Sequence, residues 1–257
     1  MGEMEYRILG PVEVRDGDTE VSLDGTKQRT ALAALLLAHG NFLSDSELSA
    51  LLWGAHPPAT RNAQLYNHMS RLRKILGPEA SIVRRSPGYQ MRIGPARFDL
   101  LDFERLSANG QAALRAGRYG EAGGLLRDAL ALWRGPALAN VSERLAGAEG
   151  PRIEEARLFA LGALFEADLA LGRHAQALPE LIRLAARYPL RERFQAQLMT
   201  ALYRCDRQAD ALAIFDRSRR MLAEELGVEP GQLLREVHRA ILTADPALRS
   251  PADLTAV

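Results

Sequence analysis

The chain has 257 residues, of which 47% are hydrophobic, and its formal net charge at pH 7 is only +1. This length and apolar content suffice for two separately packed domains. One cysteine, Cys205, excludes a disulfide framework and a thiolate zinc cluster, and the five histidines show no metal-ligand spacing. There is no signal-peptide pattern and no apolar run long enough to cross a bilayer, so we expect a cytoplasmic protein without metal or cofactor.

The charge is unevenly distributed along the chain. Residues 1–60 contain four basic and nine acidic side chains, whereas residues 61–97 contain eight basic ones against a single acid, Glu79. The second segment therefore has a local net charge of +7, which is eight minus one. Such a local excess is typical of a surface that binds nucleic acid.

The N-terminal residues predict a small sheet followed by a helix. Short runs of alternating apolar residues over 5–15 and 20–23 are interrupted by turn residues, which favours antiparallel strands. Thr26 is the expected N-cap of a helix that runs to His39, and Gly40 ends it.

Two further helices are expected before the next strand signals. Ser44 and Glu47 form a capping-box pattern at the start of the first of them, and Gly54 followed by two prolines ends it. Thr60 is the expected cap of the second, which runs to about Leu76.

This third helix has two chemically different faces. Apolar residues recur at helical spacing on the face that packs, namely Leu65, Met69, Leu72 and Leu76. The opposite face presents hydrogen-bonding side chains and no acid: Arg61, Gln64, Asn67, His68, Arg71 and Lys74. A solvated helix surface would also fit this pattern taken alone. Its position after a capped helix and a short turn favours the second helix of a helix-turn-helix.

A hairpin is expected after the third helix. Strand-like residues at 82–85 and 89–93 flank the turn Ser86-Pro87-Gly88. The order of sheet, three helices and hairpin is that of a winged helix, in which the hairpin is the wing.

Each basic or amide side chain of this winged helix has an expected role. The side chains expected to read base edges in the major groove are Gln64, Asn67, His68 and Arg71. Phosphate contacts are expected from Arg73 and Lys74 near the end of the third helix, and from Lys27 and Arg29 in the first helix. Arg85 is expected in or beside the minor groove. Arg84 is either a second wing contact or an exposed strand residue.

The second half of the chain has a different character, because helical patterns replace strand signals after Pro95. We therefore expect a winged-helix domain over 1–96 and a helical domain over 97–245. Residues 246–257 are expected to be a disordered tail. The fold class is thus mainly α with small β.

The helical half contains an internal repeat. Residues 172–178 and 206–212 match at an offset of 34 residues, the period of a tetratricopeptide repeat, and 117–123 form a third copy displaced by an insertion. About seven helices stacked as repeat-like pairs are expected. The stretch 135–151, rich in Gly, Ala and Pro, is expected to be an irregular connection.

Enzymatic motifs do not occur in the sequence. There is no phosphate-binding Gly-x-x-x-x-Gly-Lys loop and no Gly-x-Ser-x-Gly nucleophile elbow, so we do not expect an enzyme. The alternative function from another class is a repeat scaffold whose basic segment binds protein or RNA. Salt and sequence dependence of duplex binding would distinguish the two.

Collinear motifs along nearly the whole chain add a family resemblance. In the first half they are Leu9-Gly10-Pro11-Val12-Glu13-Val14, Lys27-Gln28-Arg29, Leu52-Trp53-Gly54, Pro57-Pro58-Ala59-Thr60, Ser70-Arg71-Leu72-Arg73-Lys74 and Pro87-Gly88-Tyr89. In the second half they are Leu132-Trp133-Arg134-Gly135-Pro136, Pro189-Leu190-Arg191-Glu192-Arg193 and Glu224-Glu225-Leu226-Gly227-Val228-Glu229-Pro230-Gly231. With these motifs the chain resembles the Streptomyces antibiotic regulatory protein (SARP) family, the activators of the AfsR and DnrI type.

The resemblance implies an OmpR-like winged helix-turn-helix followed by an all-α, TPR-like bacterial transcriptional activation domain. It implies binding of double-stranded DNA at direct repeats near the −35 element, as a homodimer on DNA, in the promoters of antibiotic gene clusters. Recruitment of the RNA polymerase holoenzyme through its sigma factor, and hence a nucleoid-associated location, are also implied. By the same analogy Arg71 and Arg73 are the arginines of the recognition helix, and Arg85 is that of the wing.

Overall fold

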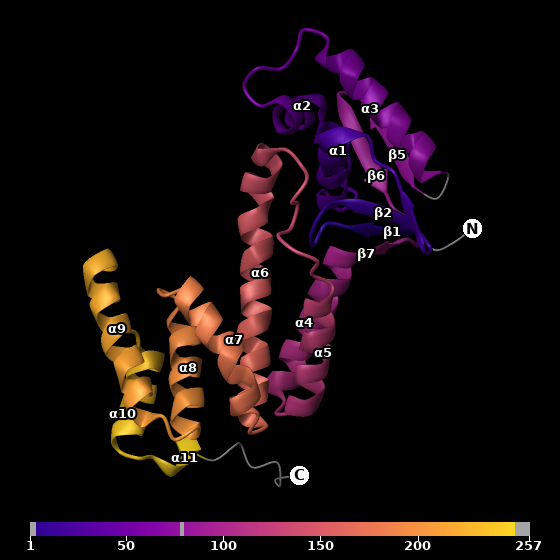
Figure 1. Ribbon diagram of the computed structural model, residues 1–257. Coiled ribbons are helices and arrows are strands. Elements are labelled where there is room, and N and C mark those ends of the chain that lie inside the picture. Colours follow the sequence, from indigo (N-terminus) through magenta and orange to yellow (C-terminus); the bar gives the residue numbers. More distant parts are fainter. Residues whose placement is uncertain (1–3, 78–79, 250–257) are drawn as a thin grey trace. The chain divides into compact units, whose positions relative to one another are not determined.

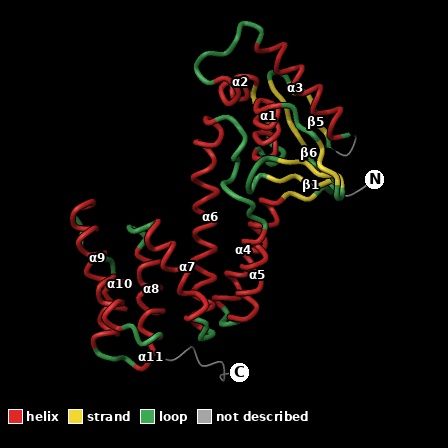
Figure 2. The backbone as a smooth tube through the Cα atoms, viewed as in Figure 1, coloured by secondary structure: helices red, strands yellow, loops and turns green. Residues whose placement is uncertain are grey.

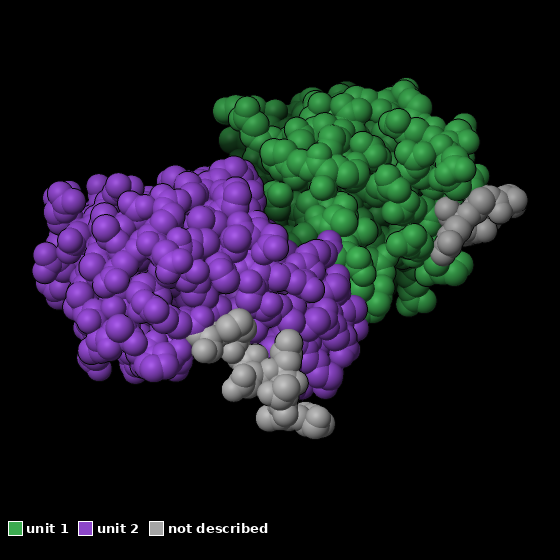
Figure 3. All heavy atoms as spheres, turned by 60° about the horizontal axis from the view of Figure 1, so that its bottom comes forward, with its two compact units in different colours: residues 1–106, 128–157 green, residues 107–127, 158–257 purple. Residues whose placement is uncertain are grey.

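The computed structural model describes residues 4–77 and 80–249, which form two compact units. Unit 1 consists of Met1–Leu106 and Asp128–Arg157, and unit 2 of Ser107–Arg127 and Leu158–Val257 (Figure 3). This division differs from the expected boundary at 96/97, because residues 128–157 lie in unit 1.

A four-stranded sheet opens unit 1. Its strands are β1 (Met4–Arg7), β2 (Glu13–Asp16), β3 (Thr19–Val21) and β7 (Arg97–Phe98), in the order β3-β2-β1-β7. The neighbours β1 and β2, and β2 and β3, are antiparallel as expected, whereas β7 pairs with β1 in parallel. All strands of the described residues belong to unit 1 (Figure 2).

Three helices follow the sheet in unit 1 (Figure 1). They are α1 (Gly25–Leu37), α2 (Asp45–Trp53) and α3 (Arg61–Leu76). The capping box of α2 is confirmed, since the Ser44 side chain accepts the backbone N–H of Glu47 and the Glu47 carboxylate accepts that of Ser44.

Two of the expected caps are wrong in detail. The helix α1 begins at Gly25, one residue before the expected cap Thr26, and Asp24 holds the N-cap position. The Thr26 carbonyl instead accepts a hydrogen bond from the Thr30 hydroxyl. Thr60 does precede α3, but its side chain does not cap the helix.

The expected wing is present as β5 (Ser81–Arg85) and β6 (Gly88–Arg92), and β6 also pairs with β4 (Phe42–Ser44). The turn contains a cis peptide bond between Ser86 and Pro87. Gly88 is required at the start of β6, because a Cβ there would lie 2.1 Å from the Leu43 carbonyl oxygen.

An irregular segment after α5, residues 134–142, lies along the winged helix, and we call it the strap. Its backbone N–H groups donate to the first loop, residues 8–12 between β1 and β2. These bonds run from Arg134 to Leu9 at 2.8 Å and from Leu138 to Ile8 at 3.0 Å. At its far end the Ser142 hydroxyl donates to the Leu51 carbonyl in α2 at 2.7 Å. The strap is therefore an integral part of unit 1, although it lies beyond the expected boundary.

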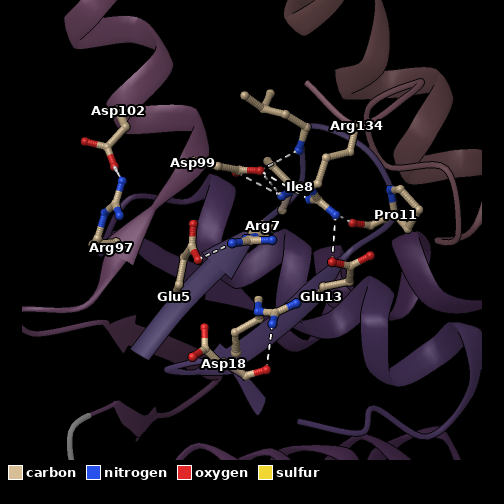
Figure 4. A network of polar contacts seen from close by, with 12 residues as sticks. Glu5, Arg7, Ile8, Pro11, Glu13, Asp18, Arg97, Asp99, Asp102 and Arg134 are labelled. Carbon is tan, nitrogen blue, oxygen red and sulfur yellow. Dashed lines mark hydrogen bonds and ion pairs between the residues drawn. The ribbon is translucent and has the colours of Figure 1, made fainter. Parts of the chain in front are cut away.

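A buried carboxylate connects the same loop to α4. Asp99 is 3% exposed and accepts the backbone N–H groups of Ile8 and Leu9 at 2.9 Å each. Its partner Arg134 also pairs with Glu13 at 2.7 Å (Figure 4). Burial raises the pKa of Asp99, while the two N–H donors and Arg134 oppose that shift.

The remaining chain is helical. Its helices are α4 (Asp99–Arg115), α5 (Tyr119–Ala131), α6 (Glu143–Ala170), α7 (His174–Arg187), α8 (Glu192–Arg204), α9 (Gln208–Leu226), α10 (Gln232–Leu242) and α11 (Pro246–Arg249). Within the described residues, α4 to α10 match the expected seven helices. The division between the units falls within α4, α5 and α6.

The three repeat copies share one local geometry. Gly117, Gly172 and Asp206 all have a left-handed backbone, with φ of 73°, 73° and 58°. Five residues later a fully or almost fully buried alanine lies in the following helix in each copy, at positions 122, 177 and 211. The repeat inferred from the sequence is therefore a structural repeat of helix pairs.

Two expectations for the helical half need correction. The stretch 135–151 is irregular only up to residue 142, because α6 begins at Glu143 and continues through Pro151. The backbone N–H of Leu145 donates to the Ser142 hydroxyl, which caps this helix. Of the expected disordered tail, 246–249 form α11, and 250–257 lie outside the described residues.

Candidate nucleic-acid interface

The helix α3 presents one packed and one exposed face, as its sequence predicts. Leu65, Met69, Leu72 and Leu76 are all 2% exposed or less. These buried positions place Asn67, Arg71 and Lys74 on the opposite side of the helix, where all three are exposed.

The exposed side chains of this face are uncommitted. In the part of the chain that the structure describes, neither a hydrogen bond nor an ion pair involves the side chains of Arg61, Asn67, Arg71 and Lys74. Their donors and acceptors are therefore available to a ligand. We call Asn67, Arg71 and Lys74 the outward face of α3.

Two side chains expected on this face are engaged within the protein instead. The Gln64 amide donates to the Thr60 hydroxyl at 2.9 Å. His68 is half-buried, with its ring 6.4 Å from that of Trp53. Burial lowers the pKa of His68, and the nearby charges of Arg71 and Lys27 lower it further. Their predicted base contacts stay predictions, and both lie at the flank of the outward face.

Arg73 ties α3 to the wing. Its Nε donates to the Ile82 carbonyl at 2.8 Å, and its guanidinium lies 5.8 Å from the centre of the Tyr89 ring. The geometry gives Arg73 a structural contact, and its predicted phosphate contact stays a prediction.

The two wing arginines differ in whether their side chains have partners within the protein. Arg84 donates to both carboxylate oxygens of Asp45 and lies 4.6 Å above the Tyr89 ring, and the hydrogen bond to Asp45 raises its pKa. Arg85 is exposed, and no partner for its side chain is found among the described residues. Arg84 is an exposed residue of strand β5, as one of the two alternatives has it, and its ion pair with Asp45 holds the wing to the start of α2. Its predicted contact with DNA stays a prediction.

The two basic residues of α1 also differ in their contacts within the protein. Lys27 is exposed, with its Nζ 5.1 Å from the centre of the Trp53 ring. Arg29 is half-buried and donates to the Leu23 carbonyl at 3.1 Å and to the Asn140 carbonyl in the strap at 3.2 Å. Lys27 therefore remains available to a ligand, whereas Arg29 holds the strap.

Sequence reasoning did not single out several residues around α3. Tyr66 is 60% exposed, and Ala63 and Ser70 lie on the side of α3 opposite the buried stripe. Arg92 at the end of β6 is exposed. The helical wheel, centred on the four buried residues of α3, is the signal that would have found Ala63 and Ser70.

The chain was compared with known proteins. Residues 98–242 match the family described as the bacterial transcriptional activator domain. The chain is 42% identical to regulatory protein AfsR of Streptomyces griseus over 250 residues, which are 97% of this chain but 26% of AfsR. It is 38% identical to regulatory protein DnrI of Streptomyces peucetius, over 95% of this chain and 94% of DnrI. The chain belongs to the SARP family of bacterial transcriptional regulators.

A solved structure supports the fold of this SARP. Mycobacterium tuberculosis EmbR, in complex with a low affinity phosphopeptide, superimposes with a TM-score of 0.90 at 32% identity. The match covers 98% of the SARP chain and 69% of that EmbR chain. The OmpR-like winged helix and helical activation domain expected from the motifs are thus confirmed as the fold class.

Two other features are absent from the part of this SARP that the structure describes. No helix there is long and apolar enough to span a membrane. No group of three or more His, Cys, Asp or Glu side chains is arranged there to hold a metal ion.

Proposed function

We propose that this protein is a sequence-specific DNA-binding transcriptional activator, with α3 inserted in the major groove. The observation that carries the proposal is the outward face of α3, whose Asn67, Arg71 and Lys74 side chains are exposed and uncommitted. If these three side chains were hydrogen-bonded within the fold, their donors would not be available to base edges.

The chemistry of the free side chains suggests their roles. Arg71 matches the O6 and N7 acceptors of guanine, and Asn67 matches the N6 and N7 groups of adenine. Lys74 and Arg61 carry charges suited to the flanking phosphates, as does Lys27 at the start of α1. Arg85 at the wing tip has a free guanidinium suited to a narrow minor groove.

The target and partners follow from family membership. We propose binding to direct repeats near the −35 element of antibiotic biosynthetic promoters, as a homodimer on DNA, in the cytoplasm at the nucleoid. Activation would then proceed by recruiting the RNA polymerase holoenzyme through its sigma factor. The likeness to regulatory protein DnrI, over 95% of this chain and 94% of DnrI, supports the underlying role in regulation.

We also propose a revised division of labour along the chain. The winged helix of residues 1–96 supplies the DNA-facing groups, but Asp99 and the strap hold its first loop and α1 in place. The DNA-binding part is therefore unit 1, and the activating part is the helical repeat domain, for which the sequence predicted residues 97–245.

The test is to incubate the purified full chain with fragmented DNA of its host and to sequence the bound fragments at low and high salt. Enrichment of promoter fragments with a shared, regularly spaced direct repeat is the expected result. The matched control is Arg71→Ala, which should lose the shared motif while retaining salt-sensitive binding. Recovery of fragments without any shared motif by the wild-type chain would favour the scaffold function instead.

A further inference from the structure

A groove in unit 2 lies outside the proposed DNA interface. It has a volume of about 450 Å³ and is lined by residues of α7, α8 and α9 and of the connections between them. Its lining is mainly apolar and includes Ile182, Ala186, Leu198, Leu202, Ile214 and Met221. Ile182, on the α7 side of the groove, is 45% exposed.

The polar groups of the groove are satisfied with one exception. Arg207 pairs with Asp210 at 2.7 Å, and the Gln195 amide donates to the Ala185 carbonyl at 2.9 Å. The Ser218 hydroxyl donates to the Ile214 carbonyl at 2.9 Å. Arg217 is exposed on the α9 wall, and its side chain has neither a hydrogen bond nor an ion pair with any described residue. The groove therefore presents one uncompensated positive charge beside an apolar floor.

The groove is long enough to take a short helical peptide. On the α9 side its lining extends from Arg207, the N-cap residue of α9, to Met221, which at 1.5 Å per residue is about 20 Å. An amphipathic helix of three to four turns has about this length. Stacked helical repeats commonly bind such segments along their concave side, with apolar side chains buried in the groove.

We infer that this groove binds an amphipathic segment of a partner protein, whose apolar stripe fills the groove and whose carboxylate pairs with Arg217. The inference goes beyond the proposed function, since the site uses none of the DNA-facing residues. It gives the helical repeat domain a binding surface of defined chemistry. Met221 suits such a role, because its flexible thioether adapts to different apolar partners.

The experiment uses the full chain and a displayed library of random peptides of about 16 residues, a length that spans the groove as a helix. Peptides are selected on the wild-type chain and depleted on Ala213→Trp, in which an indole replaces an exposed methyl group on the groove wall. The recovered peptides should carry apolar residues three and four apart, together with Asp or Glu.

Binding of the recovered peptides is then measured by fluorescence anisotropy. Arg217→Glu should weaken it at least about tenfold, whereas Arg219→Glu, an exposed position of the same helix outside the groove lining, should change it less than about twofold. Peptides in which Lys replaces the acidic residues should regain affinity for Arg217→Glu. All variants should retain wild-type DNA binding, which separates a failure of the groove from a failure of the proposed function.

Several results would overturn the inference. Equal binding of the peptides to the wild type, Ala213→Trp and Arg217→Glu would place their site elsewhere. Failure to recover any groove-dependent peptide would reject a peptide partner. If decanoate then bound the wild type and not Arg217→Glu, the groove would be a site for a small amphipathic acid instead.

Discussion

Unit 1 uses its basic side chains in two different ways. On the outward face of α3, Arg71 and Lys74 are exposed and uncommitted, whereas at the base of the wing Arg73 and Arg84 are held by Ile82 and Asp45. All four side chains lie within the same basic segment of the sequence, so their charge alone does not separate them. The comparison teaches that a partner inside the fold, and not charge alone, separates the groups that hold the winged helix from those free for DNA.

The same distinction reduces the charge available to a ligand. Of the eight basic residues in 61–97, three have partners in the described structure: Arg73, Arg84 and Arg97, the last with Asp102. The other five are Arg61, Arg71, Lys74, Arg85 and Arg92. The +7 of this segment therefore overstates the number of cations free to contact DNA, and salt-dependence measurements should report the smaller set.

The largest expected effect comes from removing the groups that hold unit 1 together. A chain ending at Ala96 lacks Asp99 and the strap, so the buried N–H groups of Ile8 and Leu9 lose their acceptors. Each unsatisfied buried donor costs about 1–3 kcal/mol, against a total stability of about 5–15 kcal/mol for a typical domain. We expect this piece to show no cooperative thermal transition by circular dichroism and no specific DNA binding.

A chain ending at Arg249 is the control, since it keeps every residue named here, and it should unfold cooperatively. If the piece ending at Ala96 folded and bound its operator as the full chain does, the strap would be dispensable. In that case the contacts that hold unit 1 together would not be needed for DNA binding, which would weaken the contrast between structural and DNA-facing side chains.

A single substitution tests the same contacts within the full chain. Asp99→Ala should lower the free energy of unfolding by about 3 kcal/mol, because two buried backbone donors and Arg134 lose a shared partner. Urea denaturation followed by circular dichroism measures this loss. Asp102→Ala is the matched control, since Asp102 pairs with two exposed arginines, Arg97 and Arg105, and the change should cost less than about 1 kcal/mol. Equal losses would show that burial of Asp99 is unimportant.

The third prediction contrasts two arginines of α3 directly. Arg71→Ala should lower affinity for the preferred operator by about 1–3 kcal/mol, or roughly 5-fold to 150-fold, and leave the unfolding free energy unchanged. Arg73→Ala should instead lower the melting temperature, because the Ile82 carbonyl and the Tyr89 ring lose their contact. Titrations with operator and unrelated DNA, paired with thermal scans, would separate the two variants. If Arg71→Ala lowered the melting temperature and Arg73→Ala lowered the operator affinity, Arg73 would be the DNA contact and Arg71 the structural residue.

Much of the fold could be predicted because it depends on local patterns. The capping box at Ser44, the buried stripe of α3 and the 34-residue repeat all involve residues close in sequence. Their predictions match the structure because side-chain periodicity and caps are set within a few residues. The start of α6 was missed, although Ser142 before Glu143 is a recognisable N-cap signal.

The strap could not be predicted from these patterns. Its contacts with the first loop are mainly backbone hydrogen bonds between segments more than a hundred residues apart, such as that from Leu138 to Ile8. Backbone groups leave no side-chain signal in a sequence. The contacts of Arg29, Arg73 and Arg84 within the fold could not be predicted for the same reason, since all three donate to carbonyl oxygens.

The smallest expected effect concerns His68, which is half-buried at the flank of the outward face of α3. Its pKa in the folded chain is lowered, first by burial beside Trp53 and then by Arg71 and Lys27. Protonation therefore favours the unfolded chain, and stability should be complete above the ordinary pKa of about 6.5 and should fall as the pH decreases through the lower folded value. The free energy of unfolding, measured by urea denaturation between pH 7.5 and 5, should lose part of this slope in His68→Gln. His56→Gln, a change at an exposed histidine, is the control and should retain the slope.

With operator DNA bound, nearby phosphates would favour the protonated ring of His68. Operator affinity should therefore rise as the pH decreases over the same interval, more in the wild type than in His68→Gln. A wild-type chain whose operator affinity fell together with its stability would place His68 away from the phosphates, among the side chains that serve the fold alone.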